Sequence, residues 1–576
     1  MSAQRSNTPL WAKASKASSP LYHDLFAHMI DVACVAEELL VSYIPRRRIA
    51  RLASELGSDA DDNAVSTTAF LAGCHDLGKA TPGFQAKVPE YKDELKRAGF
   101  EFRSVATRDP RTFRHDIATA ALLPSVIAGL APAWCSRRRW LEEVAKVIGG
   151  HHGVFPDDGS IYRVSLVCGG DDWGSLRLEL LASLARVLSV DLASVPASLP
   201  RSPSPDFCIF LAGLTSVADW VASDEQRFPF TWPIDEQAAY LAVSRARAKK
   251  AVRDIGFQAP PANENRPVPR VFIGQAARWR PIQEAAIALA KDIRQPSLVI
   301  IETETGSGKT EAAWIIADAL IGKRLASGLY TAMPTQATSN SMHDRMKCFL
   351  RRRFRYELSD VQLVHSGSAF RRWERVGLNQ PDESGTTVDI AASSWFAPKK
   401  RTLLAAFGVG TVDQGLLAVM LARHSFVRMF ALSGKVVVFD EVHAYDLYMF
   451  TLFKRLLRWL GQSGISVVIL SATLPEASRR ELIAAYTGSR PGDVDGLCQP
   501  YPRISWVGST GALRQLSVKP SPDKTISLRM IGDQPGELME ELKPRLERGG
   551  CVAVVCNTVR SCLLYTSDAA DELDGV

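Results

Sequence analysis

The sequence predicts a multidomain protein in which an all-α first domain is followed by an α/β domain built on a parallel sheet. From about Leu21 to Val221, apolar residues recur at helical spacing, with few of the alternating runs that indicate strands. Beyond a proline-rich segment, short apolar runs such as Val436 to Phe439 instead have the composition of buried strands. The 576 residues are enough for on the order of three or four domains.

Composition and cysteine usage favour a globular enzyme of the cytoplasm. Hydrophobic residues make up 46% of the chain and charged residues 23%, and no apolar run approaches the roughly 20 residues that span a bilayer. The ten cysteines are scattered without Cys-x-x-Cys pairs, which favours a reducing compartment. The N-terminus has no secretory signature, and we expect no membrane association. A net charge of +7 is compatible with nucleic-acid binding without requiring it.

Histidine is concentrated in the helical first part beyond what packing needs. Six of the ten histidines lie there: His23, His28, His75, His115, His151 and His152. Two carboxylates accompany them, Asp76 directly after His75 and Asp219 near the end of an apolar helical run. Any one of these histidines alone is more often a satisfied core or surface imidazole. The joint set suits divalent cations such as manganese, iron, cobalt or nickel, and also magnesium.

The order and local sequence of this set resemble a known family. His28, His75-Asp76, His115, His151-His152 and Asp219 are similar to the ligands of the HD metal-dependent phosphohydrolase superfamily, in the version found in type I CRISPR-associated helicase-nucleases. Trp11-Ala12-Lys13 and Asp219 to Ser223 look like further signatures. The resemblance implies that Asp76 bridges two metals, one completed by His28, His75 and Asp219 and the other by His115, His151 and His152. It also implies that Lys79 lies beside the scissile phosphate.

A phosphate-binding loop follows the linker that we expect at residues 241–270. The buried-strand run Ser297 to Ile301 leads into Glu302-Thr303-Glu304-Thr305-Gly306-Ser307-Gly308-Lys309-Thr310 and then a helical segment. Backbone N–H groups and a helix N-terminus hold phosphates in such a loop, while the lysine reaches the terminal phosphates and Thr310 binds magnesium. The sequence therefore predicts an Mg-ATP site. Thr303 stands where the usual loop has glycine, a departure that helicases commonly show.

Two later motifs extend this site. Asp440-Glu441-Val442-His443 ends a buried strand, at the edge where an open α/β sheet presents ligands, and Ser471-Ala472-Thr473 ends another. The order of the three motifs resembles a DExH-box lobe of superfamily-two helicases, which have a RecA-like fold. That resemblance implies that Asp440 holds magnesium, Glu441 polarises the attacking water, and His443 with Ser471 to Thr473 couples hydrolysis to movement. The predicted ATP-binding residues are Gln283, Thr305, Gly306, Ser307, Gly308, Lys309, Thr310, Asp440 and Glu441.

Further segments look like the DNA-gripping motifs of the same helicases. Pro334, Thr335 and Gln336 lie in one of them, and Thr411 and Gln414 in another. Their hydroxyls, amides and N–H groups would hold phosphates without reading bases. The basic run Lys399-Lys400-Arg401 is either a DNA-facing track or a solvated surface, and the sequence does not decide between them.

The predicted domains are an HD nuclease at residues 1–240, the linker at 241–270, a first RecA-like lobe at 271–495 and the start of a second at 496–565. In the last of these we expect strands near 526–530 and 551–556 around a helix near 538–546. Residues 566–576 resemble nothing in the family, and we interpret them as a truncation or assembly artefact. Because arginines from a second lobe normally reach the ATP, we expect little DNA-stimulated ATPase from this chain.

The combined hypothesis is a metal-dependent nuclease, with Asp76 and Lys79 in its centre, joined to an ATP-dependent DNA motor in which Glu441 serves hydrolysis. By resemblance, the substrate is single-stranded DNA opened by a guide-RNA surveillance complex of the Cascade type, and the protein acts as a monomer. Two alternatives remain open at this point. One is an HD phosphohydrolase acting on small nucleotides, and the other is an inactive fragment that only binds DNA.

Overall fold

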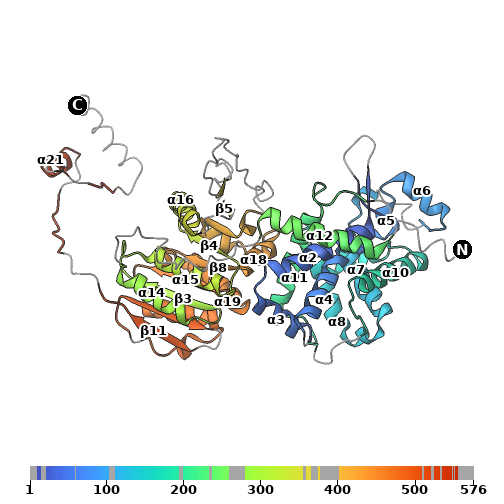
Figure 1. Cartoon of the computed structure of the whole chain (residues 1–576), viewed down its shortest axis with the longest axis horizontal. Coiled ribbons are helices and arrows are strands. Elements are labelled where there is room, and N and C mark those ends of the chain that lie inside the picture. Colours follow the sequence, from blue (N-terminus) through green and yellow to red (C-terminus); the bar gives the residue numbers. More distant parts are fainter. Residues whose placement is uncertain are drawn as a thin grey trace, which may run out of the picture. The chain divides into compact units, whose positions relative to one another are not determined.

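The computed structural model describes residues 10–14, 21–58, 60–102, 110–193, 199–231, 236–257, 279–353, 359–364, 374–376, 401–497, 499–508, 512–520, 525–531, 535–547, 549 and 552–555. The chain divides into two compact units, residues 1–519 and 520–576, which we describe separately. The first unit holds a helical domain followed by an α/β lobe (Figure 1).

The helical domain opens with a two-stranded antiparallel sheet, β1 (Trp11–Ala14) and β2 (Tyr22–Asp24). Asp24 then caps the next helix, because its carboxylate accepts hydrogen bonds from the backbone N–H groups of Phe26 and Ala27. The main helices are α2 (Leu25–Ser42), α3 (Arg46–Glu55), α4 (Asp61–Gly73), α6 (Pro89–Arg97), α7 (His115–Leu130), α8 (Arg138–Ile148), α9 (Asp158–Ser165), α10 (Asp171–Val187), α11 (Pro205–Ala222) and α12 (Gln237–Ile255). The short 3-10 helix η1 (Cys74–Lys79) and the short α5 (Pro82–Gln85) follow α4.

Helices α2 and α11 form the centre of this domain. Almost every residue of α2 up to Ala36 is buried, and α2 packs against α4, α11 and α12. Among the described helices, α11 is long and apolar enough to cross a membrane by composition, but 67% of that stretch is buried inside the fold. Helix α11 packs against α2, α8 and α18, which identifies it as a core helix.

The α/β lobe is built on a nine-stranded sheet in the order β11-β10-β3-β9-β8-β4-β7-β5-β6. Its central strands from β3 to β5 are parallel, which confirms the predicted fold class. The strands are β3 (Ser297–Glu302), β4 (Gly328–Met333), β5 (Ser359–Val364), β6 (Glu374–Val376), β7 (Phe407–Thr411), β8 (Lys435–Phe439), β9 (Val467–Ser471), β10 (Arg503–Gly508) and β11 (Leu513–Ser517). The helices of the lobe are α14 (Pro281–Asp292), α15 (Lys309–Gly322), α16 (Gln336–Arg353), α17 (Val412–Leu416), α18 (Ser425–Ser433), α19 (Leu447–Gln462) and α20 (Glu476–Thr487).

Alternation along the strands divides the lobe into two cores. Val299, Val436 and Val438 point to the face covered by α14, α15 and α16. Val437 and Phe439 point to the opposite face, which α18 and α19 cover and where the hydrophobic core is continuous with that of the helical domain. The two domains of the first unit therefore share one buried core.

Two expected boundaries differ from the structure. The linker predicted from residue 241 is helical at its start, because α12 continues to Ile255 and buries Ala248, Val252 and Ile255 against the domain. Residues 503–517, assigned by sequence to a second lobe, instead extend the first lobe's sheet: β10 pairs antiparallel with β3 and with β11. Pairing with a distant strand leaves no local signal in the sequence, so the boundary was placed too early.

In the second unit, helix α21 (Pro535–Leu546) agrees with the prediction and the strands do not. The described residues 525–531 and 552–555 form no strand, and Leu528 and Met530 are almost fully exposed. A strand requires a neighbour for its backbone hydrogen bonds, and the described part of this unit offers none. The predicted tail, residues 566–576, lies outside the described residues.

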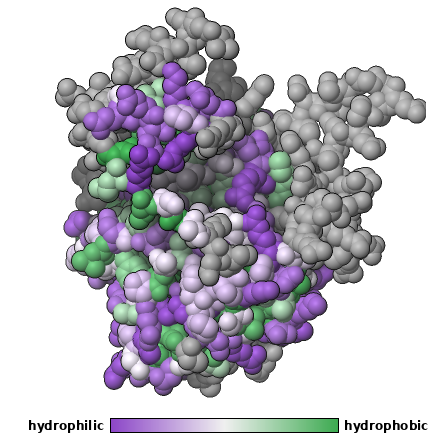
Figure 2. Space-filling view, turned by 90° about the vertical axis from the view of Figure 1, so that its left-hand side faces the viewer, coloured by the Kyte–Doolittle hydropathy of each residue, from purple (hydrophilic) through white to green (hydrophobic). Residues whose placement is uncertain are grey.

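Figure 2 shows one face of the molecule, on which hydrophilic and hydrophobic residues are interspersed in small areas. No broad hydrophobic area dominates the described residues on that face. Scattered exposed apolar residues of this kind are ordinary on a protein surface.

Candidate metal centre and nucleotide pocket

Five segments of the helical domain bring the predicted metal ligands together. His28 comes from α2, His75 and Asp76 from η1, His115 from the first residue of α7, His151 and His152 from the turn after α8, and Asp219 from α11. The tight approach of η1 to α7 requires glycine at position 78, because a Cβ there would lie 2.0 Å from the carbonyl oxygen of His115. The hydroxyl of Thr119 in α7 stabilises the same contact, because it accepts a hydrogen bond from the N–H of Gly78 and donates one to the carbonyl of His75.

Asp76 lies at the centre of the cluster and offers one oxygen to each side. Its Oδ2 is 3.4 Å from Nε2 of His28 and 3.3 Å from Nε2 of His75. Its Oδ1 is 3.3 Å from Nε2 of His115. The ammonium of Lys79 lies 2.5 Å from Oδ2, which places a positive charge beside the same carboxylate.

The remaining residues divide into two groups around Asp76. One contains His28, His75 and Asp219, and the other His115, His151 and His152; within each group the donor atoms lie within 4.8 Å of one another. In the second group, Nε2 of His152 is 3.2 Å from Nε2 of His115. Three donors on each side and a shared carboxylate form a set that can hold two divalent cations.

Two ring orientations are fixed by backbone carbonyls. Nδ1 of His75 lies 3.1 Å from the carbonyl oxygen of Ala72, and Nδ1 of His151 lies 2.9 Å from that of Ile148. Because a carbonyl only accepts, each Nδ1 carries a proton, which leaves Nε2 as the ring atom that faces the cluster and can bind a metal. This is the arrangement in which outer partners orient histidine ligands toward a metal.

Unpaired buried nitrogens indicate that the site fits a cation. Three ring nitrogens have no hydrogen-bond partner among the described residues: Nδ1 and Nε2 of His28, and Nε2 of His75. Both side chains are fully buried. A buried polar atom without a partner costs roughly 1–3 kcal/mol. Two of these atoms, Nε2 of His28 and Nε2 of His75, lie 3.3–3.6 Å from oxygens of Asp76 and Asp219, which is the chemistry of a metal site.

The electrostatics of the cluster keep most of its ligands in metal-binding forms, with His75 as the exception. Burial lowers the pKa of His28 well below its ordinary value, that of His115 to about 4 and that of His151 to about 3, so these rings are neutral near pH 7. Burial opposes the charge of Asp76, but His75 and Lys79 outweigh it and hold the pKa of that carboxyl well below its usual range. Burial would also lower the pKa of His75, yet Asp76 and Asp219 raise it to about 9. Without a metal this ring is therefore charged near pH 7, and a bound cation would replace the proton on its Nε2.

The structure places two residues that lie outside the predicted ligand set. His23 is not part of the cluster, because its Nε2 pairs with Asp31 at 3.1 Å and its Nδ1 accepts from the N–H of Thr231. Lys13, quoted in the sequence only as part of a signature, has its ammonium 3.4 Å from Oδ1 of Asp219. Asp219 is 206 residues away in sequence, so spacing could not predict this ion pair. The only local signal was a lysine that follows three apolar residues.

The phosphate-binding loop connects β3 to α15. Gly306 and Gly308 have φ of +81° and +96°, which side chains other than glycine rarely adopt. A Cβ on Gly308 would also lie 2.4 Å from Nε2 of Gln283. The ammonium of Lys309 donates to the carbonyl of Thr303 at 3.1 Å and so lies over the loop that would receive phosphates.

A cavity of about 390 Å³ opens in front of this loop. Of the predicted nucleotide residues, Thr305, Gly306, Gly308, Lys309, Thr310, Asp440 and Glu441 line it. Gln283 and Ser307 do not: Gln283 accepts from the N–H of Arg280 beside Gly308, and Ser307 donates to the carbonyl of Glu304 within its own loop. Arg280 and Arg345, which sequence reasoning missed, add two positive side chains to the lining.

The coupling motifs meet beside the cavity. Glu441 adopts a left-handed backbone conformation with φ of +52°, and its Oε2 lies 3.3 Å from Nδ1 of His443. The same nitrogen is 3.3 Å from the hydroxyl of Ser471, which donates to the carbonyl of Thr473. Burial and the neighbouring Glu441 raise the pKa of Asp440 to about 6.

The predicted DNA-gripping residues differ in their exposure. Thr335 and Gln336 are exposed after β4, with Pro334 half-buried beside them. Thr411 is only 5% exposed at the end of β7, and Gln414 is half-buried. Lys399 and Lys400 lie outside the described residues, and Arg401 has its guanidinium 5.4 Å from the ring centre of Trp220 in the helical domain.

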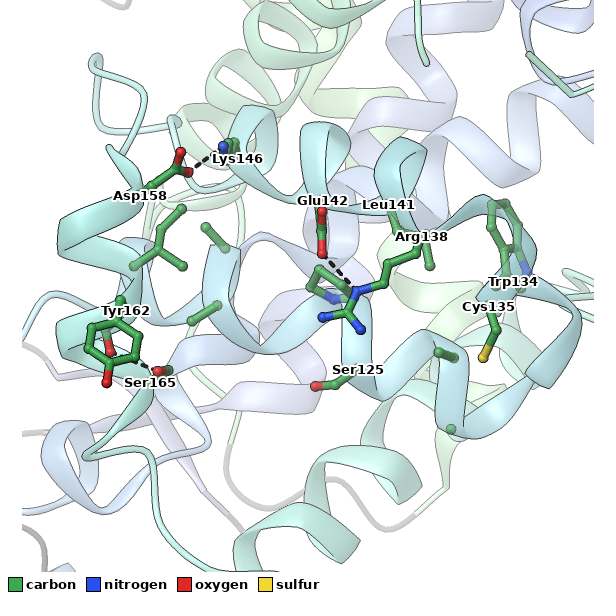
Figure 3. Close-up of a pocket in the computed structure, with 16 residues that line it drawn as sticks. Ser125, Trp134, Cys135, Arg138, Leu141, Glu142, Lys146, Asp158, Tyr162 and Ser165 are labelled. Atoms are coloured by element: carbon green, nitrogen blue, oxygen red, sulfur yellow. Dashed lines mark hydrogen bonds and ion pairs between the residues drawn. The ribbon is translucent and has the colours of Figure 1, made fainter. Parts of the chain in front are cut away.

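A larger groove of about 960 Å³ lies on the helical domain among α7, α8 and α9 (Figure 3). Its charged side chains pair with each other: Arg138 with Glu142, one turn further along α8, at 2.9 Å, and Lys146 with Asp158 of α9 at 2.5 Å. Since none of the predicted ligands, nucleotide residues or DNA contacts lines it, the groove takes no part in the two sites above.

Comparison with known proteins connects the helical domain to one family. A family model described as "Cas3, HD domain" matches residues 11–228. The CRISPR-associated endonuclease/helicase Cas3 of Thermus thermophilus is 34% identical over 573 residues, covering 97% of this chain and 59% of the relative.

Solved structures give the same result for the two domains together. One described as the crystal structure of a CRISPR-associated protein has a TM-score of 0.81 at 33% identity, covering 99% of this chain and 64% of the other. The T. fusca Cas3-ATP structure has a TM-score of 0.76 at 28% identity, covering 98% and 64%. The chain thus spans less than two thirds of the length of the relatives that it matches.

Proposed function

The chain belongs to the Cas3 family of CRISPR-associated HD nuclease/helicases, and on that premise we propose that its first domain is a metal-dependent nuclease for single-stranded DNA. The observation that carries the proposal is the position of Asp76, whose two oxygens face two separate groups of three donors. Two bound cations would supply an activated water and neutralise the charge that develops on the phosphate.

The residues of the chain divide the remaining work. His28, His75, Asp76 and His151 are at most 2% exposed and form the fixed floor of the site. His152 is exposed and the side chain of His115 is 17% exposed, so a phosphodiester reaches the cluster from their side. The ammonium of Lys79, beside Asp76, attracts and orients the anionic backbone.

We propose that the α/β lobe binds Mg-ATP in the cavity before the phosphate-binding loop. Lys309 and Thr310 contact the phosphates and magnesium, Asp440 holds magnesium, and Glu441 orients the attacking water. Pro334, Thr335, Gln336, Thr411 and Gln414 hold the DNA backbone. Because the relatives are CRISPR-associated, the guide-RNA surveillance complex of the Cascade type is the proposed source of the single strand, and the proposed acting form is a monomer.

Cleavage of circular single-stranded DNA tests the nuclease. The 576-residue chain is stripped of metal and then supplied with Mn²⁺, Co²⁺, Ni²⁺ or Mg²⁺ without ATP. We expect cleavage that depends on the metal and is lost in Asp76→Ala. Asp158→Ala, which removes an exposed carboxylate of the same domain, is the matched control and should cleave like the parent.

The same experiment separates the alternatives. Phosphate release from nucleotides without DNA cleavage would replace the proposal with a small-nucleotide phosphohydrolase. Equal cleavage by the parent and Asp76→Ala would mean that the cluster is not the nuclease. DNA binding without either reaction, in a chain that takes up metal, would favour the inactive DNA-binding fragment.

A further inference from the structure

We propose that His424, in the α/β lobe, is a positioning residue for the metal centre of the helical domain. It contacts the two segments that carry His152 and Asp219, and through them it fixes ligands that it does not touch. The inference rests on the proposed metal-dependent nuclease and deepens it, because it makes the centre dependent on the neighbouring lobe, most strongly in the half that contains His152.

The first contact is with the turn that carries His151 and His152. The backbone N–H of His424 donates to the carbonyl of Gly153, the next residue, at 3.1 Å. The imidazole covers the same glycine: a Cβ on Gly153, whose φ is +108°, would lie 2.6 Å from Nε2 of His424. Arg423 adds a longer hydrogen bond, 3.4 Å, to the carbonyl of His152. The backbone on the C-terminal side of His152 is therefore held by the α/β lobe.

The second contact is with the end of α11. The ring of His424 packs edge-on against Trp220, with centres 5.4 Å apart, and Trp220 directly follows Asp219. Arg401 covers Trp220 with its guanidinium 5.4 Å from the ring centre. Two residues of the α/β lobe thus fix the indole next to a candidate ligand. Within the helical domain, Ser216 of α11 donates to the carbonyl of His151 at 3.0 Å and joins the two segments.

The conformation of His424 is itself unusual. It is a non-glycine residue with φ of +59° at the N-terminus of α18, a backbone state that costs on the order of 1–3 kcal/mol. Packing holds it there, because it is only 5% exposed and α18 lies directly against α11 (Figure 1). The contact between these helices is close enough that a Cβ on Gly213 would lie 2.4 Å from Cβ of Phe430.

The two halves of the centre differ in their dependence on these contacts. His28 and His75 are held by α2 and η1, deep in the core of the helical domain. His152 is exposed and its turn is fixed from the side of the α/β lobe. Loss of the His424 ring should therefore weaken the metal bound by His115, His151 and His152 more than the metal bound by His28, His75 and Asp219.

Calorimetric titration of the metal-free 576-residue chain with Mn²⁺ tests this. The substitution His424→Gly keeps the left-handed backbone and its N–H but removes the ring. We expect the parent to bind two metals, and the variant to bind one of them roughly 10–100-fold more weakly, the usual effect of losing a partner that orients a ligand. His424→Phe restores a ring against Gly153 and Trp220 and should recover most of the affinity. Leu421→Ala, at a fully exposed residue of the same segment, is the matched control.

Thermal unfolding without metal accompanies each titration, so that a folding defect is recognised separately. Two equally tight metals in a folded His424→Gly chain would overturn the positioning role and leave the nuclease proposal intact. A parent chain that binds no metal would instead overturn the proposed function. Equal weakening by Gly and Phe would also contradict the inference, because the ring would then not be the positioning element.

Discussion

The candidate metal centre draws its donors from five segments spread between His28 and Asp219, whereas the nucleotide pocket takes six of its fourteen lining residues from one short segment, residues 305–311. The ligands of the metal centre are mostly buried side chains oriented by packing and by backbone carbonyls. The loop of the pocket is exposed at Thr305 and Gly306 and depends on the backbone conformation of two glycines. The metal centre is thus formed by tertiary packing alone, whereas the pocket depends to a large part on one short segment of the chain.

The pKa of the central carboxylate is shifted in opposite directions in the two sites. Asp76 has a pKa well below its ordinary range, because His75 and Lys79 outweigh its burial. Asp440 has its pKa raised to about 6 by burial and by the neighbouring Glu441. The metal centre is therefore compensated by nearby positive groups within the protein, while the pocket depends more on the ligand to supply the opposite charge.

Removing a single buried donor should have the largest effect. In His28→Ala, we expect Mn²⁺ affinity at one of the two metal positions to fall by more than about 100-fold, beyond the effect of losing an orienting partner. The affinity for ATP should stay unchanged, since His28 lies in the core of the other domain. Calorimetric titration with Mn²⁺ and then with Mg-ATP measures both. Weakened ATP binding in a folded chain would show that the two sites are coupled.

The reciprocal change is Lys309→Ala. A hydrogen bond to a charged group contributes about 1.5–3 kcal/mol, so we expect Mg-ATP affinity to fall by roughly 30-fold. Metal-dependent cleavage of circular DNA without ATP should match the parent. Lys323→Ala is the control, because its ammonium donates to carbonyls at the end of α14 rather than lining the pocket. Loss of cleavage in Lys309→Ala would contradict the independence of the two sites.

Glycine substitutions test the packing of the metal centre more gently. Gly78→Ala forces a Cβ against the backbone of α7, 2.0 Å from one atom and 2.7 Å from another, and we expect a loss of about 1–3 kcal/mol in the free energy of unfolding. Gly322→Ala meets nothing within 4 Å at the end of α15 and should be neutral or slightly stabilising. Denaturant unfolding of the metal-free chains compares the two. Equal stabilities would mean that η1 can move away from α7 at little cost.

The pocket and the metal centre also differ in how much of each could be predicted from the sequence. The pocket could be predicted because its residues follow consecutive motifs at the ends of parallel strands, which meet at one edge of the sheet. The metal ligands could be named only through a family resemblance, since spacing alone does not bring residues 28 and 219 together. Lys13 and His424 were missed because their partners are distant in sequence. His23 was already outside the predicted ligand set, and its pairing with Asp31 explains why it is not a ligand.

The smallest expected effect is a pH dependence of nucleotide binding through Asp440. An ordinary aspartate stays ionised down to about pH 4, but a carboxyl whose pKa is about 6 loses its charge as the pH falls through 6. At pH 5 only about a tenth of the Asp440 side chains would be ionised, so their contribution to Mg-ATP affinity should fall by up to about tenfold. The ratio of affinities between the parent and Asp440→Asn isolates this group from the titration of ATP itself. That ratio should shrink between pH 7.5 and pH 5, and a constant ratio would show that nucleotide binding does not change the ionisation of Asp440 over this range.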